Sequence, residues 1–153
     1  MRNPIIRAVF LSWLIAGGLM SGVAQAETEI LSLNSTALRE MTLESLPPWP
    51  DDMVLSGTNE HGQKILHEGE FVIALYEAMP ATIDVAIPYT YDEYGLVLEG
   101  SVVLISTEGV RQEYQTGDQF LVPRGWTGTW EMPSRFRELI IVVVEVEGVS
   151  AKL

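Results

Sequence analysis

Hydrophobic and polar residues alternate along much of the chain, and the alternation predicts β-strands. The clearest case is residues 82–87, whose apolar face consists of Ile83, Val85 and Ile87. Other short stretches rich in strand-forming residues are 69–78, 95–98, 102–106, 110–114, 119–122 and 128–131. Glycine and proline residues separate these stretches, and no interval between them has the pattern of an amphipathic helix. The spacing therefore predicts an all-β domain, either a sandwich or a barrel.

The last predicted strand, residues 138–146, has the sequence ELIIVVVEV and differs from the others because both of its faces are apolar. This pattern is typical of a strand buried on both sides. If the strand instead lay at an exposed sheet edge, Glu138, Glu145 and Glu147 would protect it from aggregation.

The segment before the strands has no sustained periodicity. Residues 35–41 can form one or two helical turns capped by Asn34 or Ser35, and Pro47, Pro48 and Pro50 then favour an extended chain. We expect residues 27–50 to form an arm that lies on the barrel or crosses to a second subunit, with Trp49 as its packing anchor. Residues 51–62 are rich in turn-forming residues, and the main domain is expected to span 51–148.

The first 26 residues have the three parts of a secretory signal peptide. Arg2 and Arg7 provide positive charge, an apolar stretch follows, and Ala24-Gln25-Ala26 provides the small residues of a cleavage site. Glycine and serine interrupt the apolar stretch, which makes it a poor membrane anchor. We expect cleavage after Ala26, a periplasmic or secreted protein, and no stable membrane insertion after cleavage.

Charge and cysteine content narrow the choice of partners. The chain has nine Lys and Arg, 21 Asp and Glu, and no Cys. Removal of the first 26 residues takes away two arginines and leaves a net charge near −14. Such a surface repels nucleic-acid phosphates, and the core must stabilise the fold without disulfides.

The turns between the strands carry two motifs with fixed spacing. Six residues separate Glu93 from Gly100, in the order Glu-x6-Gly, and Gly117, Pro123 and Gly125 follow the order Gly-x5-Pro-x-Gly. With the flanking residues, the ordered set resembles the small single-domain cupins, especially the ureidoglycine-aminohydrolase-like group. The resemblance covers about residues 50–144 and implies a double-stranded β-helix, the cupin jelly-roll barrel, often dimeric and with a ligand cavity inside.

Metal-binding cupins place histidines four and six residues before the motif glutamate and three residues after the glycine that ends the second motif. In this chain these positions hold Tyr89, Ile87 and Gly128, so only Glu93 has a ligating side chain. A transition-metal site needs about three or four N, O or S ligands. We therefore expect no metal site and no cofactor. His61, in a turn, is expected to be solvated, and His67, before a strand, is expected to be a surface or hydrogen-bonded structural residue.

The resemblance implies that the motif positions face the barrel interior. Gly128 would leave space there, aromatic residues would line the walls, and Glu93 would supply one buried carboxyl group, as is usual in small-molecule pockets. The candidate ligand-binding residues are Ile87, Tyr89, Tyr91, Glu93, Gly128, Trp130 and Arg137.

Glu93 is also the candidate catalytic residue, because burial would raise its pKa and suit it to general acid or base catalysis. The alternative is that Glu93 only accepts hydrogen bonds and fixes the barrel mouth. Trp130 can equally be a core residue, and Arg137 can pair with a glutamate. Asp92 cannot share a substrate atom with Glu93, because adjacent strand residues face opposite sides.

Three functions fit these observations. The leading hypothesis is a secreted, metal-free cupin-fold protein that binds a small organic ligand in its barrel. The second is a small-metabolite enzyme of the aminohydrolase, isomerase or lyase type that uses Glu93. The third is a structural or regulatory protein whose barrel is filled by side chains. We expect a homodimer because of the N-terminal arm and the buried last strand.

Overall fold

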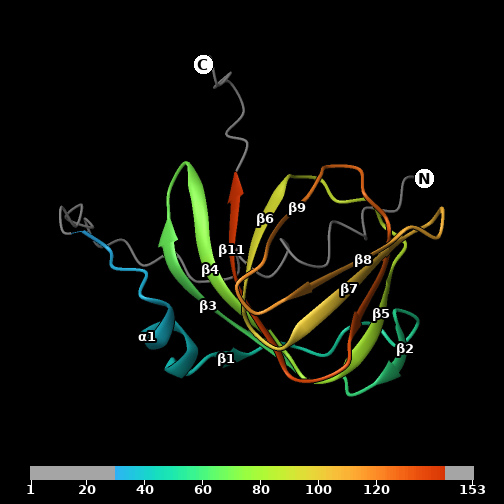
Figure 1. Ribbon diagram of the computed structural model, residues 1–153, viewed down its shortest axis with the longest axis horizontal. Helices are drawn as coiled ribbons and strands as arrows, with labels where there is room; N and C mark the ends of the chain where they lie inside the picture. The colour runs from blue at the N-terminus through green and yellow to red at the C-terminus, as the bar shows by residue number, and fades with distance from the viewer. Residues whose placement is uncertain (1–29, 144–153) are drawn as a thin grey trace, which may run out of the picture.

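The computed structural model describes residues 30–143, which form two antiparallel β-sheets and one short helix (Figure 1). Sheet A has six strands in the order β1 (Glu44–Ser45), β3 (His61–Glu68), β4 (Phe71–Ala78), β11 (Phe136–Val143), β6 (Glu93–Glu99) and β9 (Gln119–Val122). Sheet B has five strands in the order β2 (Val54–Gly57), β5 (Ala81–Val85), β10 (Gly128–Met132), β7 (Ser101–Ser106) and β8 (Arg111–Gln115).

From β4 onward the chain crosses repeatedly between the two sheets. Strands β4, β6, β9 and β11 belong to sheet A, while β5, β7, β8 and β10 belong to sheet B. The two sheets face each other and enclose a common interior (Figure 1). The predicted all-β, jelly-roll architecture is confirmed.

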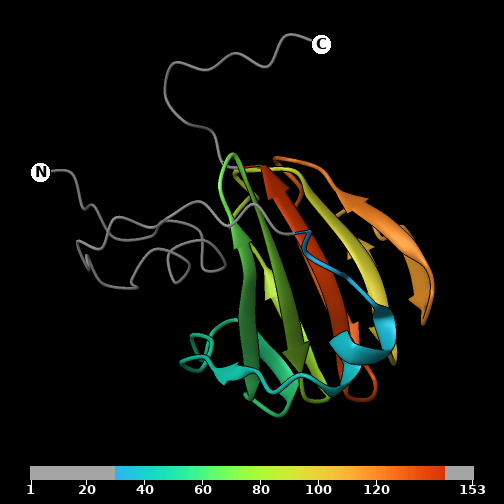
Figure 2. The ribbon, with the colours of Figure 1, turned by 90° about the vertical axis from the view of Figure 1, so that its left-hand side faces the viewer.

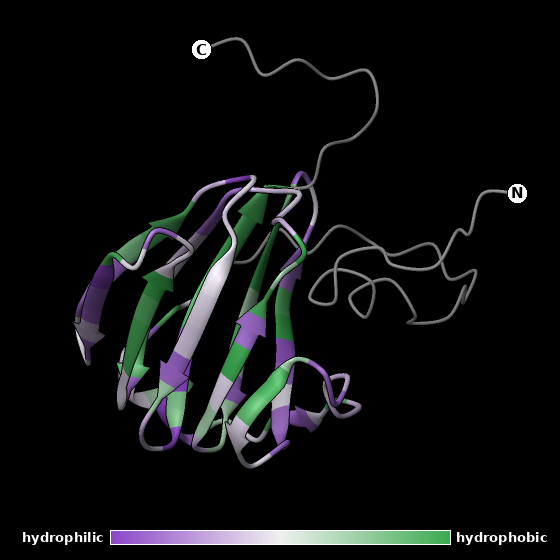
Figure 3. Ribbon diagram, turned by 90° about the vertical axis from the view of Figure 1, so that its right-hand side faces the viewer, coloured by the Kyte–Doolittle hydropathy of each residue, from purple (hydrophilic) through white to green (hydrophobic). Residues whose placement is uncertain are grey.

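Alternation along the strands places one set of side chains in that interior. Every second residue of β5 and β10 is buried, and the two strands pair so that Trp130 lies opposite Ile83. Along the strands hydrophobic and hydrophilic residues follow one another, and many turns are hydrophilic (Figure 3). This period of two is the signal that predicted the strands.

Strand β11 lies in the middle of sheet A and is buried on both faces, as the sequence predicted. Phe136, Ile140 and Val142 face the interior cluster, whereas Leu139 belongs to a second cluster on the outer face. Residues 144–146 of the predicted strand lie outside the described residues.

Helix α1 (Ser35–Glu40) covers part of that outer face (Figure 2). Asn34 caps it, because its side-chain oxygen accepts hydrogen bonds from the backbone N–H groups of Thr36 and Ala37 at 3.0 and 3.3 Å. Leu38 is 1% exposed and packs with Leu75, Leu98 and Leu139. The arm therefore lies on the barrel of its own chain, one of the two expected arrangements.

Strands β1 and β2 occur where an irregular arm and turns were expected, and β3 begins at His61, within the residues expected to form turns. These segments have weak strand preference, and they form by pairing with neighbours such as β4 and β5. Pairing and packing outweigh local preference in such strands. The predicted signal peptide lies outside the described residues. Within residues 30–143, no helix has the length and apolar character needed to cross a membrane.

Candidate functional site

Glu93 enters the interior at the first position of β6. The preceding segment is fixed by two backbone hydrogen bonds, from Tyr89 N–H to Trp126 C=O at 3.1 Å and from Gly125 N–H to Tyr89 C=O at 2.8 Å. Tyr89 and Tyr91 are both buried, and their rings meet edge to face with centroids 5.6 Å apart. The structure therefore brings together Tyr89, Tyr91 and Glu93, as expected.

Asp92 points the other way, which confirms the expected alternation. Its side chain is exposed and accepts a hydrogen bond from the Arg124 backbone N–H at 2.7 Å. Glu93, one residue later, is only 2% exposed.

A second buried carboxyl group, Glu138, lies on the neighbouring strand β11 and was missed in the sequence. It is 2% exposed and stands opposite Tyr76 on β4 and Val97 on β6. Gly95 makes room for it, because a Cβ atom at Gly95 would lie 2.8 Å from Glu138 Oε2 and 2.6 Å from Phe120 Cζ. The available signal was the spacing: Glu138 has the same parity as interior Phe136, Ile140 and Val142.

Burial dominates the electrostatics of this acid pair, as we name Glu93 and Glu138. Desolvation raises the pKa of Glu93 to about 8. Desolvation, followed by the charge of Glu93, raises the pKa of Glu138 well above its ordinary value. Both carboxyl groups therefore favour the protonated form at neutral pH, and either is suited to donate a proton.

The tyrosines around the acid pair respond to the same environment. Burial raises the pKa of Tyr76, Tyr89 and Tyr91, and the charges of Glu93 and Glu138 raise it further. All three phenols are therefore neutral hydrogen-bonding groups at physiological pH.

Among residues 30–143, two buried polar atoms in the interior lack hydrogen-bond partners. These are Glu138 Oε2 and Trp130 Nε1. Trp130 contacts the rings of Phe120 and Phe136 at centroid distances of 5.8 and 6.3 Å. An unpaired buried polar group costs about 1–3 kcal/mol, so such groups usually indicate water, a ligand or a functional role.

A small cavity lies beside Trp130. It has a volume of about 10 Å³ and is lined by Tyr76, Ile83, Val85, Trp130 and Met132. This is close to the minimum space for one water molecule. Any larger group would require neighbouring side chains to move.

Tyr76 connects the interior to a histidine near the surface. Its hydroxyl lies 3.3 Å from His61 Nδ1, and His61 Nε2 lies 2.7 Å from Pro47 C=O. Because a carbonyl only accepts, Nε2 donates to Pro47, and in the neutral ring Nδ1 accepts from Tyr76. Burial lowers the pKa of His61, although its backbone hydrogen bond to Pro47 acts in the opposite direction.

His61 was expected to be solvated in a turn, and that expectation was wrong. It begins β3, is half-buried and stacks on Trp49 with centroids 3.9 Å apart. Trp49 is 2% exposed, as expected of a packing anchor. His67 is exposed on β3 and contacts the ring of Phe71.

Gly128 does not provide the space that the sequence suggested. A Cβ atom there would lie 2.8 Å from the Trp126 ring, so that side chain already occupies the region. Ile87 is half-buried in the segment that joins β5 to β6. Trp130 is buried on the same face as Gly128, as alternation predicted.

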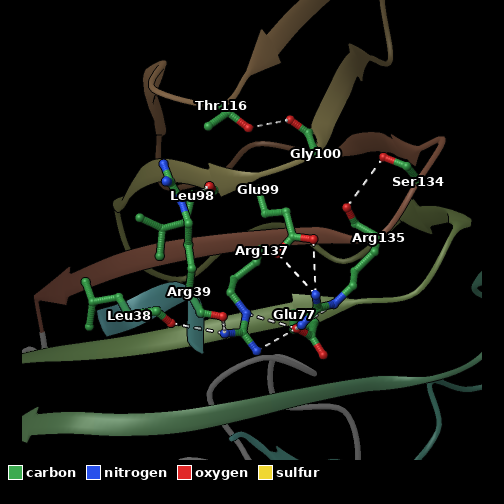
Figure 4. A network of polar contacts seen from close by, with 10 residues as sticks. All are labelled: Leu38, Arg39, Glu77, Leu98, Glu99, Gly100, Thr116, Ser134, Arg135 and Arg137. Carbon is green, nitrogen blue, oxygen red and sulfur yellow. Dashed lines mark hydrogen bonds and ion pairs between the residues drawn. The ribbon is translucent and has the colours of Figure 1, made fainter. Parts of the chain in front are cut away.

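Arg137, another candidate ligand-binding residue, is on the opposite face of β11 from the acid pair. Its side chain is 3% exposed, and its guanidinium donates to Glu77 Oε2 at 2.9 and 2.7 Å (Figure 4). It also donates to the backbone carbonyls of Leu38 and Arg39 at the end of α1. The structure therefore separates Arg137 from the other candidates, because odd and even residues of a strand face opposite ways.

The interior residues do not fit a transition-metal ion. Within residues 30–143, no three His, Cys, Asp or Glu side chains are grouped so that they could hold a metal. Of the four positions that supply metal ligands in cupins, only Glu93 has a ligating side chain. Glu138 adds a second carboxylate, which is still short of the usual three or four ligands.

Comparison with known proteins identifies the fold. Residues 67–137 match the family model described as the EutQ-like cupin domain. Residues 67–137, slightly less than half of the chain, are therefore similar to a cupin domain. Among solved structures, the chain is similar to ethanolamine utilization protein Q from Salmonella typhimurium, with 22% identity and a TM-score of 0.50 over 55% of this chain and 69% of that chain.

Two further solved structures have the same fold. One is a protein of unknown function, of the DUF861 family, from Pseudomonas syringae pv. tomato, with 21% identity and a TM-score of 0.57 over 68% of this chain and 45% of that chain. The other is a Neisseria meningitidis protein, with 13% identity and a TM-score of 0.51 over 74% of this chain and all of that chain. At these identities the likeness shows the fold alone.

The chain spans only part of the length of these relatives. The match covers 69% of the Salmonella EutQ protein, 62% of the Clostridium difficile EutQ protein and 45% of the Pseudomonas protein. No functionally curated protein matches it.

Proposed function

We propose that this cupin binds a small organic ligand in the interior of its barrel, at the acid pair and the aromatic residues around it. The observation that carries the proposal is the pair of fully buried carboxyl groups, Glu93 and Glu138, one of which has an unpartnered oxygen. Strongly perturbed ionisable groups in an enclosed interior are typical of binding and catalytic sites.

The unpartnered atoms define what the ligand offers. Trp130 Nε1 is a donor and needs an acceptor, whereas Glu138 Oε2 can accept a hydrogen bond or, when protonated, donate one. A ligand with polar groups at two ends would pair with both atoms. The rings of Tyr89, Tyr91 and Trp130 would cover its apolar part.

Space limits the size of this ligand. The 10 Å³ cavity beside Trp130 admits a water-sized group, so a larger ligand displaces the side chains of Trp130 or Met132. Rotation of such side chains on binding is common even where the backbone stays fixed. The proposal therefore favours compact ligands of a few non-hydrogen atoms.

We also propose that binding needs no metal and that the mature protein is exported. The replacement of the three ligand histidines by Ile87, Tyr89 and Gly128 supports the first point, and the signal-peptide pattern of residues 1–26 supports the second. Fractionation of cells that express the full chain, followed by N-terminal sequencing, tests export. The expected result is a periplasmic protein that begins at Glu27.

Native mass spectrometry of the purified protein, together with a thermal-shift screen of small polar compounds, tests ligand binding. We expect one compound per barrel that raises the melting temperature. The Glu138→Leu and Trp130→Phe variants should lose the effect, because each removes one unpartnered group. Failure of every compound to shift the wild-type protein, with no extra mass bound, would contradict ligand binding.

The small cavity favours a second candidate, a structural or regulatory dimer with a filled barrel. Exposed apolar residues on sheet A give it a contact surface: Phe71 and Val143 pair across β4 and β11, and Leu121 lies on β9. Sedimentation distinguishes the candidates. A dimer that Leu121→Lys and Val143→Lys convert to a folded monomer, with no ligand response, would favour this second function.

A further inference from the structure

The barrel interior is electrostatically incomplete. Two fully buried carboxyl groups point into it, and the one buried basic residue among residues 30–143, Arg137, is bonded to Glu77 on the far side of β11. Among the described residues no basic side chain therefore neutralises the acid pair from within. Buried carboxylates are normally paired with a cation or neutralised by a proton.

The surroundings of the acid pair suit an organic cation. Tyr76 on β4 lies opposite Glu138, and Tyr89 and Tyr91 precede Glu93 in the chain; all three tyrosines belong to the buried interior cluster. Aromatic rings attract cations through their negative faces, most strongly where water is excluded. Glu138 Oε2, buried and unpartnered, is a ready acceptor for an N–H donor.

We propose that the ligand of this barrel is a small primary ammonium compound, whose cationic nitrogen is held by Glu93 and Glu138 among the tyrosine rings. The inference rests on the proposed function and specifies its ligand class. An ammonium group is about the size of a water molecule, so it suits an interior with little free volume. It also offers three N–H donors, which two carboxyl groups can accept together.

Binding of the cation releases a proton. Before binding, the interior is neutral because the acid pair carries its protons. The ammonium nitrogen keeps its three protons and brings one positive charge into the interior, and one carboxyl group loses its proton to solvent to balance that charge. No bond other than this O–H bond is broken, and one proton leaves for each cation bound. The titratable groups that face the pair from β4 and from the segment before β6 are the three tyrosines, which stay neutral throughout.

Isothermal titration calorimetry of the full-length protein with three probes of similar size tests the ligand class. The probes are methylammonium, methanol and formate, which are cationic, neutral and anionic. We expect methylammonium alone to bind. The titration is repeated at pH 7 in buffers of different ionisation enthalpy. Because the buffer takes up the released proton, the apparent binding enthalpy should become more negative as the ionisation enthalpy of the buffer increases.

Glutamine variants locate the site. Glu93→Gln and Glu138→Gln keep the shape and remove the charge, and each should weaken methylammonium binding about tenfold or more. Glu113→Gln is the matched control, because Glu113 is exposed on β8. This variant should bind methylammonium with the same affinity as the wild type. Binding of methylammonium that neither interior variant weakens would overturn the proposal.

The remaining outcomes separate this inference from the proposed function. If methanol or formate binds and Glu138→Gln changes that binding, the barrel is a ligand site but the cation class is wrong. If no probe binds and the wider thermal-shift screen finds only compounds without an ammonium group, the class is again wrong. If neither experiment finds a ligand, both proposals fail.

Discussion

Two adjacent residues of β11 show that a buried ionisable side chain has hydrogen-bond partners on the outer face of sheet A but is left partly unpartnered on the inner face. Arg137 and Glu138 are 3% and 2% exposed, and they point in opposite directions. On the outer face, Arg137 meets a glutamate and two helix carbonyls, so its donors are used (Figure 4). On the inner face, Glu138 has an unpartnered oxygen and no basic neighbour among the described residues.

The contrast teaches which buried charge is structural. Arg137 attaches α1 and Glu77 to the last strand, so its ion pair is part of the architecture. Glu138 contributes no comparable contact, and burying it without a partner costs stability. A costly group that the fold does not use is the stronger indicator of function.

The largest expected effect is on the outer face. Arg137→Ala should destabilise the protein by about 3–5 kcal/mol, because it leaves the α1 carbonyls of Leu38 and Arg39 without their donor and leaves Glu77 paired only with the exposed Arg135. Urea unfolding measures this change. Arg111→Ala, which removes an exposed pair with Glu131, is the control and should leave the unfolding midpoint nearly unchanged. If both variants lowered the free energy of unfolding equally, Arg137 would contribute no more to stability than an exposed arginine, and the contrast between the two faces would not hold.

On the inner face, Gly95→Ala should destabilise by about 1–3 kcal/mol, because the added methyl group collides with Phe120 and the Glu138 carboxyl group. Thermal unfolding measures the loss. Gly95→Ala combined with Glu138→Ala should recover part of it. A Gly95→Ala protein as stable as the wild type would show that the carboxyl group does not depend on this space.

The acid pair should make stability depend on pH. Because the folded-state pKa of Glu93 is raised from 4.5 to about 8, the folded protein binds more protons between these values. The contribution of protonated Glu93 to the free energy of unfolding is then fully present below about pH 4.5, and it is lost as the pH rises to about 8. The fall should amount to several kcal/mol, because each unit of pKa difference corresponds to about 1.4 kcal/mol, and Glu93→Gln with Glu138→Gln should flatten it. Stability that rises over this range in the wild type alone would contradict the assignment.

The smallest expected effect concerns His61. Burial lowers its pKa, so it should titrate below 6.5 in an NMR pH series. Tyr76→Phe should raise that pKa by a few tenths of a unit, because the hydroxyl hydrogen bond favours the neutral ring. This histidine stabilises the fold above pH 6.5, and the contribution is lost as the pH falls below that value. An unchanged titration in Tyr76→Phe would mean that the hydroxyl does not donate to Nδ1.

The sequence allowed the strands from Phe71 onward to be predicted because their burial follows a period of two, which local composition records. It also placed Tyr89, Tyr91 and Glu93 together, through the spacing of the turn motifs. The same spacing suggested space at Gly128, but Trp126 fills that space from a neighbouring loop. Such a contact depends on tertiary packing and leaves no local pattern.

Glu138 shows a second limit of sequence reasoning. Within an apolar run, a glutamate at the end of a strand has the pattern of a protective charge, and Arg137 beside it has the pattern of a ligand contact. Which of the two faces the interior depends on the register of β11 against its neighbours, which the sequence does not reveal. That register places Glu138 opposite Tyr76 and Val97 on the inner face and Arg137 opposite Glu77 on the outer face.

The position of β11 in sheet A has a consequence for the order of folding. The strand lies between β4 and β6, which pair with it and not with each other. A nascent chain that has reached β10 therefore has both strands but no partner for their facing edges. The sheet closes only after residues 136–143 have been synthesised and inserted, which requires contacts distant in sequence, and such contacts form slowly. Formation of the native sheet A therefore depends on residues 136–143.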